Sequence, residues 1–236
     1  MTYIFLVAGK GSRLHPLTYN YPKSLYRLDD DTTVIQRMVN LLRSYDKDAE
    51  IVAVTGFMAS KIEENMPDIT YIRNPFYGVT NSLASLWFAK EYLLKGDVVI
   101  INGDVVVSNE IADKILTKPV SGAVVLADSS IRTDGDYNVQ VHNDRVVVMS
   151  KDIKSYFGEY AGITMLDREA AEHLYEETVL MNDDGCYECW YEDALVQMIF
   201  RKNFKLGYLD ICNYDWTEID CANDLVKAQE IHKGKM

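Results

Sequence analysis

Basic residues and long apolar runs are scarce in this sequence. Its 236 residues include 24 Lys and Arg against 36 Asp and Glu, which gives a formal net charge of −12 at pH 7. A nucleic acid partner requires a basic face, so this charge argues against one. No stretch approaches the ~20 apolar residues of a membrane-spanning helix, and the N-terminus has the pattern of a core strand, not of a secretory signal. We therefore expect a soluble cytoplasmic protein with no membrane partner.

Cysteine is also scarce, with Cys186, Cys189, Cys212 and Cys221 alone. The first two form a C-x-x-C pair. A zinc ribbon needs a second such pair, and the last two cysteines are too far apart to make one. A redox pair would normally open a helix beside a strand, and a disulfide is not expected in a reducing compartment. We expect free, partly buried thiols.

The most informative stretch runs from Tyr3 to Leu28. It begins with the apolar residues 4–7, which are typical of a buried parallel strand. It continues as Ala8-Gly9-Lys10-Gly11-Ser12-Arg13, and Pro22-Lys23 follows a few residues later. Small residues let backbone N–H groups approach an anion, and the lysines and the arginine add positive charge. This combination predicts a phosphate-binding loop.

Two common nucleotide-binding motifs do not fit this loop. A Walker A motif needs G-x-x-x-x-G-K-[ST], and Gly9 and Gly11 are too close together for it. The dinucleotide motif G-x-G-x-x-G would place its third glycine at Leu14, whose side chain prevents close helix packing. On the two glycines alone, an ordinary turn and a nucleotide site both stay open.

Strand-like and helix-like segments alternate along the chain, as in a parallel sheet with crossover helices. The expected strands cover residues 4–7, 51–54, 70–73, 98–102, 123–127, 138–142, 146–150, 160–166 and 206–211. The expected helices cover residues 33–43, 60–65, 82–94, 168–177, 190–201 and 223–232. We expect one α/β domain over residues 1–236, with a Rossmann-like, mostly parallel sheet and flanking helices. Residues 1–107 would form its nucleotide-binding half and residues 108–236 its acceptor-binding half.

Two carboxylates stand where such a sheet binds ligands. Asp104 follows the apolar strand at residues 98–102, and ligands lie beyond the carboxyl ends of strands in open α/β sheets. Asp220 lies in an acidic cluster before the last helix. Each carboxylate alone is better explained as a cap of a turn or helix. Together with the N-terminal loop, the pair indicates a site for Mg²⁺.

The complete N-terminal string, G-x-G-S-R-L-x-P-L-T followed by Pro22-Lys23, resembles the signature of nucleotidylyltransferases. These enzymes join a nucleoside triphosphate to a phosphorylated small molecule and release pyrophosphate. Three further matches are N-P-x-Y-x-x-x-N-S-L-x-S-L at Asn74–Leu86, Gly103-Asp104 and Glu218-Ile219-Asp220. They narrow the resemblance to the small cytidylyltransferases, which include bacterial phosphocholine and 2-aminoethylphosphonate enzymes. The resemblance covers essentially the whole chain.

The resemblance implies a nucleotide-diphospho-sugar transferase-like fold and a role for each matching residue. Asp104 and Asp220 would bind Mg²⁺, Lys23 would contact phosphate, and Arg13 would grip the β- and γ-phosphates with its fork of donors. The residues expected to bind the nucleotide are Ala8, Gly9, Gly11, Ser12, Thr80, Asn81, Ser82 and Ser85. One of Asn81 and Ser82 is also expected to cap the following helix.

The acceptor end is expected among aromatic and acidic residues near the C-terminus. Tyr191, Asp193 and Glu218 resemble the box that holds choline in the phosphocholine enzymes, in which aromatic faces and carboxylates attract an amine. The alternative is that Trp190 or Tyr191 belongs to the core, since neighbouring helix residues point in different directions. Lys151 stands where sugar-phosphate relatives bind the acceptor phosphate, with a solvated surface lysine as the alternative.

We therefore expect a Mg²⁺-dependent cytidylyltransferase that transfers CMP from CTP and releases pyrophosphate. Its acceptor would be a small zwitterionic phosphate or phosphonate, such as phosphocholine, 2-aminoethylphosphonate or a phosphorylated amino-acid derivative, used for capsule or surface polysaccharide. One alternative is a sugar-1-phosphate nucleotidylyltransferase using CTP or UTP. Another is a nucleotide-binding module without catalysis. The oligomeric state, with a homodimer as one possibility, stays open.

Overall fold

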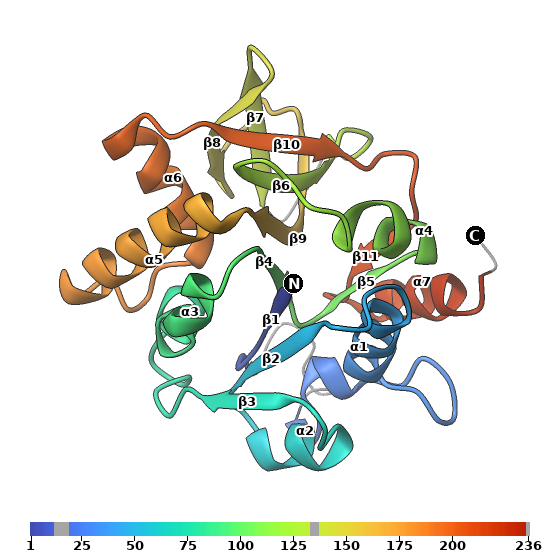
Figure 1. The fold of residues 1–236 in the computed structure, drawn as a ribbon. Coiled ribbons are helices and arrows are strands. Elements are labelled where there is room, and N and C mark those ends of the chain that lie inside the picture. Colours follow the sequence, from blue (N-terminus) through green and yellow to red (C-terminus); the bar gives the residue numbers. More distant parts are fainter. Residues whose placement is uncertain (12–18, 133–136, 235–236) are drawn as a thin grey trace.

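A mixed sheet lies at the centre of the molecule (Figure 1). The computed structural model describes residues 1–11, 19–132 and 137–234. Within them, the main sheet has nine strands, seven of which follow the order β10-β6-β9-β4-β1-β2-β3, while β7 pairs with β8 and β9. Their bounds are β1 Thr2–Val7, β2 Glu50–Thr55, β3 Thr70–Arg73, β4 Val98–Asn102, β6 Ala123–Asp128, β7 Asn138–His142, β8 Arg145–Ser150, β9 Gly158–Leu166 and β10 Leu206–Asp210.

The strands of the N-terminal half pair in parallel, as expected. β1 lies between β2 and β4 and is parallel to both, with Phe5 opposite Ala53 on one side and Ile101 on the other. β2–β3 and β10–β6 are also parallel, whereas β9 is antiparallel to both β4 and β6. The predicted α/β fold with a mostly parallel sheet and flanking helices is confirmed.

Helices cover both faces of the sheet. They are α1 Val34–Tyr45, α2 Ala59–Asn65, α3 Ser82–Phe88, α4 Asn109–Ile111, α5 Arg168–Asp183, α6 Tyr191–Lys202 and α7 Ala222–His232. Side chains alternate across a strand, so Ile4 packs with residues of α3, α5 and α6, and Phe5 with residues of α1. In Figure 1, α3, α5 and α6 accordingly lie on one side of β1, and α1, α4 and α7 on the other.

The predicted helix over residues 82–94 is wrong in its second half. α3 ends at Phe88, and a 3-10 helix, η4, covers Lys90–Leu94. The break is at Ala89, whose N–H bonds to the carbonyl of Leu86, three residues earlier, so the tighter 3-10 pattern replaces the α-helical one. A second short element, the 3-10 helix η3 at Lys23–Leu25, begins after Pro22.

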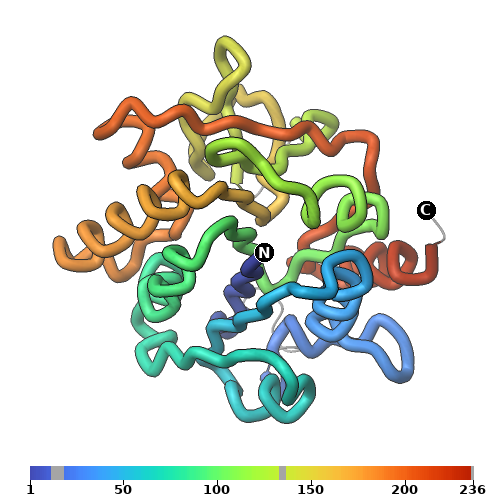
Figure 2. Tube along the Cα trace, viewed as in Figure 1, coloured from blue at the N-terminus to red at the C-terminus, as the bar shows by residue number. Residues whose placement is uncertain are grey.

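A small second sheet closes the fold, and the sequence patterns did not predict it. β5, Val105–Val107, pairs antiparallel with β11, Trp216–Glu218, and aligns Val105 with Glu218. Figure 2 shows the red C-terminal segment running beside the green segment that follows β4. The pairing brings the end of the chain next to the carboxyl end of β4. None of the helices in the described part of the chain is long and apolar enough to cross a membrane.

Candidate active site

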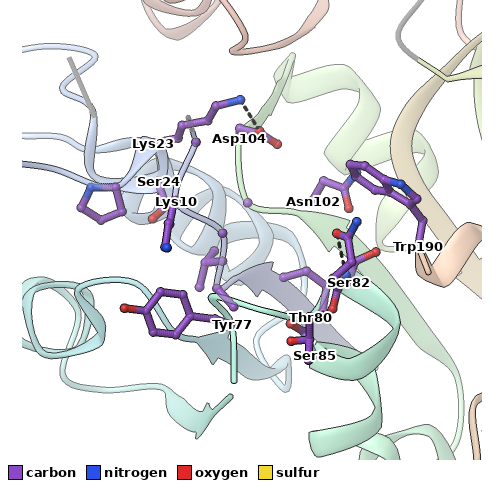
Figure 3. A pocket seen from close by; sticks show the side chains of 18 of the residues that line it. Lys10, Lys23, Ser24, Tyr77, Thr80, Ser82, Ser85, Asn102, Asp104 and Trp190 are labelled. Atoms are coloured by element: carbon purple, nitrogen blue, oxygen red, sulfur yellow. Dashed lines mark hydrogen bonds and ion pairs between the residues drawn. The ribbon is translucent and has the colours of Figure 1, made fainter. Parts of the chain in front are cut away.

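A cavity of about 380 Å³ opens at the carboxyl ends of β1 and β4. Figure 3 shows Lys10 and Lys23 on one side of it and Ser82 and Trp190 on the other. The structure places ten of the predicted site residues in its lining: Ala8, Gly9, Gly11, Lys23, Thr80, Asn81, Ser82, Ser85, Asp104 and Glu218. Ser12 and Arg13 lie outside the described residues. Asp220 is not part of the lining, but it contacts Lys23. Gly9 and Gly11 of the glycine loop therefore share one cavity with Asp104.

The Lys23 ammonium lies between two carboxylates. Its Nζ is 3.0 Å from Asp104 Oδ2 and 2.5 Å from Asp220 Oδ1, and the first of these contacts is drawn in Figure 3. All three side chains are largely buried. The pairing of β5 with β11 produces this arrangement, since the backbone N–H of Ile219 also bonds to the carbonyl of Asp104.

Burial and charge act in opposite directions on Lys23. Burial, the largest single effect, lowers the pKa of the ammonium, but the combined charge and hydrogen bonds of Asp104 and Asp220 outweigh it. The pKa of Lys23 is therefore raised above its usual value. Lys23 carries its positive charge throughout the physiological pH range, and a phosphate group that enters the pocket meets a fixed cation.

The donor set around Lys23 also fits a divalent metal ion. Asp104 and Asp220 direct carboxylate oxygens at one shared cation, which here is the lysine ammonium. No group of three or more His, Cys, Asp and Glu that could hold a metal occurs among the residues that the structure describes. Mg²⁺ typically takes one or two carboxylates and completes its shell with water and substrate phosphates. The two aspartates match that pattern.

Glycines bring the ends of β1 and β4 close together. A Cβ on Gly103 would lie 2.4 Å from Val7 Cγ1 and 2.8 Å from the Leu6 carbonyl oxygen, so no larger residue fits there. Gly11 has a φ of 61°, which favours glycine. At Gly9, by contrast, a Cβ would meet nothing within 4 Å. The turn after β4 is therefore packed tightly against β1, whereas the loop after β1 has open space at Gly9.

A buried amide organises the loop before α3. Asn74 is 1% exposed, and its Nδ2 donates to Thr80 Oγ1 and to Ser85 Oγ, both at 3.1 Å. Its own Oδ1 accepts from the Phe76 N–H at 2.8 Å. Asn74 therefore fixes two hydroxyls that line the pocket, and its role is one of support.

The start of α3 is attached to the C-x-x-C segment. Asn81 is the N-cap of the helix, as one of the two candidates was expected to be, and its N–H bonds to the Tyr187 carbonyl at 2.9 Å. Ser82 Oγ accepts from the N–H of Tyr191 at 2.8 Å. The cysteines are free, as predicted, with Cys221 exposed and the other three half-buried. The segment thus contributes backbone carbonyls to the site rather than thiols.

The acceptor prediction requires a correction at Tyr191. Its side chain is fully buried, and its hydroxyl hydrogen-bonds with Tyr160 and, at 3.2 Å, with Thr164 Oγ1. The ring has no face open to a ligand. Trp190 lines the pocket instead, because successive residues at the start of α6 point in different directions. Of the two aromatic candidates, Tyr191 is the core residue.

Asp193 and Lys151 lie beside the pocket rather than in its lining. Asp193 Oδ2 accepts from the Trp190 N–H at 2.8 Å, and Oδ1 accepts from the Tyr137 hydroxyl at 3.2 Å. The prediction that Asp193 binds the acceptor is therefore replaced by a role in capping α6. Lys151 is exposed, and its Nζ lies 4.3 Å from the centroid of the Trp190 ring, within the range of a cation–π contact.

The sequence-based prediction missed several residues of the lining, among them Asn102 and Ser24. Asn102 is the last residue of β4 and lines the pocket between β1 and Trp190. The signal that could have found it is the amide that ends an otherwise apolar strand just before Gly103-Asp104. Ser24, which follows Lys23, is another. Its hydroxyl is buried and has no hydrogen-bond partner among the residues that the structure describes.

The fold and this pocket define a nucleotide-binding α/β transferase, and comparison with known proteins identifies the family. Residues 3–177 match the MobA-like NTP transferase domain, and the chain belongs to that family. The CTP:phosphoglutamine cytidylyltransferase of Campylobacter jejuni is 24% identical over 250 residues, which cover 95% of this chain and 98% of the relative. The 2-aminoethylphosphonate cytidylyltransferase of Lancefieldella rimae is 30% identical over 110 residues, which cover 45% of this chain and 44% of the relative.

The structure of the CTP:phosphocholine cytidylyltransferase from Streptococcus pneumoniae superposes with a TM-score of 0.78 at 20% identity and covers 98% of each chain. That likeness concerns the fold. The expected resemblance to small nucleotidylyltransferases is confirmed, and the protein is an enzyme of the nucleotidyltransferase class with cytidylyltransferase relatives.

Proposed function

We propose that the protein is a Mg²⁺-dependent cytidylyltransferase that transfers CMP from CTP to a small zwitterionic phosphate or phosphonate and releases pyrophosphate. The observation that carries this proposal is the Lys23 ammonium between Asp104 and Asp220, at one end of a pocket whose other parts are a glycine loop and the start of α3. The choice of CTP is supported by the two relatives described above, both of which are named as cytidylyltransferases.

In this reaction a phosphate or phosphonate oxygen of the acceptor attacks the α-phosphorus of CTP. A new P–O bond forms, the bond between the α-phosphorus and the bridging oxygen breaks, and pyrophosphate leaves with that electron pair. No general base is needed, because the acceptor oxygen is already ionised at neutral pH. The main barrier is repulsion between two anions, so fixed positive charge is what the protein has to supply.

Different residues of the pocket contact the nucleoside and the phosphates. The backbone at Ala8 and Gly9 and the hydroxyls and amides at the start of α3 bind the nucleoside. Lys23 neutralises charge that grows on the α-phosphate oxygens. Asp104 and Asp220 hold Mg²⁺, which when bound would screen the charge on the phosphates that meet there. Arg13, outside the described residues, stays the predicted partner of the β- and γ-phosphates.

The acceptor is assigned to the side of the pocket formed by Trp190 and Glu218. An aromatic face and a carboxylate favour an amine on the acceptor, and the Lys151 ammonium over Trp190 favours an anionic group next to it. A zwitterionic acceptor satisfies both. Phosphocholine, 2-aminoethylphosphonate and a phosphorylated amino-acid derivative are the three acceptors to compare, since relatives or a structural neighbour are named for this chemistry.

The test is a pyrophosphate-release assay that crosses ATP, GTP, CTP and UTP with these three acceptors and glucose 1-phosphate, with products identified by mass spectrometry. The proposal expects release with CTP and an amine-bearing acceptor, and a CDP-linked product. Release with glucose 1-phosphate and with none of the amine-bearing acceptors would instead establish the sugar-1-phosphate alternative.

A further inference from the structure

One buried acid next to the pocket has no role in the chemistry described so far. Glu192, in the first turn of α6, is 2% exposed, and its Oε2 has no hydrogen-bond partner in the described part of the chain. A buried carboxylate oxygen without a partner costs stability. A position that serves packing alone would be better filled by an apolar side chain of similar size.

The neighbours of Glu192 are residues of the acceptor side. The Asn102 side chain, which lines the pocket, and the Lys151 ammonium both lie near its carboxylate and favour the ionised form. Lys151 in turn covers the ring of Trp190, which also lines the pocket. Glu192 therefore connects the end of β4, the residue after β8 and the start of α6.

We propose that Glu192 is a positioning residue for the acceptor end of the pocket, where its buried carboxylate, next to Trp190 at the start of α6, keeps Lys151 over the Trp190 ring through charge. The effect on acceptor binding rests on the proposed function, whereas the effect on the position of Lys151 does not. An ionised Glu192 attracts Lys151, and a protonated one does not. The acceptor should therefore bind more tightly when Glu192 is ionised, and CTP should be affected little.

The surroundings of Glu192 place this change near neutral pH. Burial, the largest effect, raises the pKa of Glu192 to about 7, with Asp193 acting in the same direction and Asn102 and Lys151 in the opposite one. The other ionisable groups around it are the buried hydroxyls of Tyr137, Tyr160 and Tyr191, whose pKa values are raised by burial first and also by the Glu192 charge. Glu218 acts on Tyr191 in the same sense. These tyrosines stay protonated, so Glu192 is the group that titrates.

A titration of the whole protein tests the structural part without any substrate. The indole N–H of Trp190, assigned by comparison with Trp190→Phe, is followed by NMR between pH 5.5 and 8.5. We expect a shift with a midpoint near pH 7 that disappears in Glu192→Gln. The matched control is Glu177→Gln, because Glu177 is buried as well, at 1% exposed, but lies on α5 beside Arg201, and this variant should keep the transition. A transition that persists in Glu192→Gln would overturn the proposal.

The kinetic part uses any acceptor that the panel assay identifies. Glu192→Gln should raise the KM for the acceptor about tenfold at pH 8, the size expected for one charge-assisted interaction, with the KM for CTP unchanged. Lys151→Met, at an exposed position that should fold normally, should remove the same pH dependence. If Lys151→Met keeps that dependence, the proposal is wrong. If no acceptor is used at all while the indole titration behaves as expected, the proposed function fails and the positioning role stands.

Discussion

Lys23 and Asp220 are separated by 197 residues in the sequence, and their side chains meet at 2.5 Å. The contact exists because β11 returns to pair with β5, immediately after Asp104. A lysine from the start of the chain and an aspartate from its end thereby reach the carboxyl end of β4. The catalytic centre that we propose is thus complete only when the two ends of the chain have come together.

Substitution of Trp190 should affect acceptor binding, and substitution of Tyr191 should affect stability. Trp190→Ala should raise the KM for the acceptor, because the ring lines the pocket, with little change in the free energy of unfolding. Tyr191→Phe should lower the free energy of unfolding by about 1–2 kcal/mol, because it removes buried hydrogen bonds with Tyr160 and Thr164, and it should leave the KM unchanged. Denaturant unfolding and steady-state kinetics measure the two effects. Exchanged outcomes would show that Tyr191 faces the ligand.

Asn74→Ala should impair the nucleotide side of the pocket without touching the acceptor side. The change removes the donor that holds the hydroxyls of Thr80 and Ser85. We expect a loss of about 1–3 kcal/mol in the free energy of unfolding, as for a lost buried hydrogen-bonding partner. We also expect a rise of about tenfold in the KM for CTP, equivalent to ~1.4 kcal/mol. An increase in the KM for the acceptor instead would contradict this division of the pocket.

Glu192→Gln should make the protein more stable at pH 8. Burial raises the pKa of Glu192 to about 7 in the folded protein, against about 4.3 in an unfolded chain. Between these values the folded state holds a proton that the unfolded state has lost, so stability falls as the pH rises from about 4.3 to 7, and the penalty stays above pH 7. The neutral glutamine escapes it, and we expect a gain of about 1–3 kcal/mol at pH 8 that vanishes at pH 4.

Urea unfolding of the wild type and Glu192→Gln at the two pH values measures this difference. Glu177→Gln is the control for a buried acid that already has a basic neighbour, Arg201, at 3.3 Å. Equal stabilities of the wild type and Glu192→Gln at pH 8 would contradict the buried charge.

The sequence patterns predicted the elements whose burial produces a local pattern of apolar residues. Residues 4–7 and 98–102 show as apolar runs because their strands are buried on both faces of the sheet. β5 and β11 could not be predicted, because each has three residues and forms only by pairing with the other. Trp216–Glu218 therefore looked like part of an acidic cluster.

The candidate site was predictable where residue type alone defines the chemistry. Glycines, a lysine and two aspartates in the order of a known family were sufficient to name Lys23, Asp104 and Asp220. The orientation of α6 was not predictable, because which of Trp190 and Tyr191 faces the pocket depends on how the Asp193 cap and the partners of Tyr191 set the helix against β9. Side-chain direction at the start of a helix is a tertiary property, and the acceptor side depends on it.

The most direct test of the central claim compares CDP-product formation by the wild type, Lys23→Met, Asp104→Asn and the control Lys95→Met, at saturating CTP and acceptor with Mg²⁺. Lys95 pairs with Glu50 and lies outside the lining of the cavity. We predict that Lys23→Met and Asp104→Asn lose activity by about 10²–10³, the loss typical of removing a main electrostatic stabiliser, while Lys95→Met stays at the wild-type rate. Wild-type activity in Asp104→Asn would contradict the account.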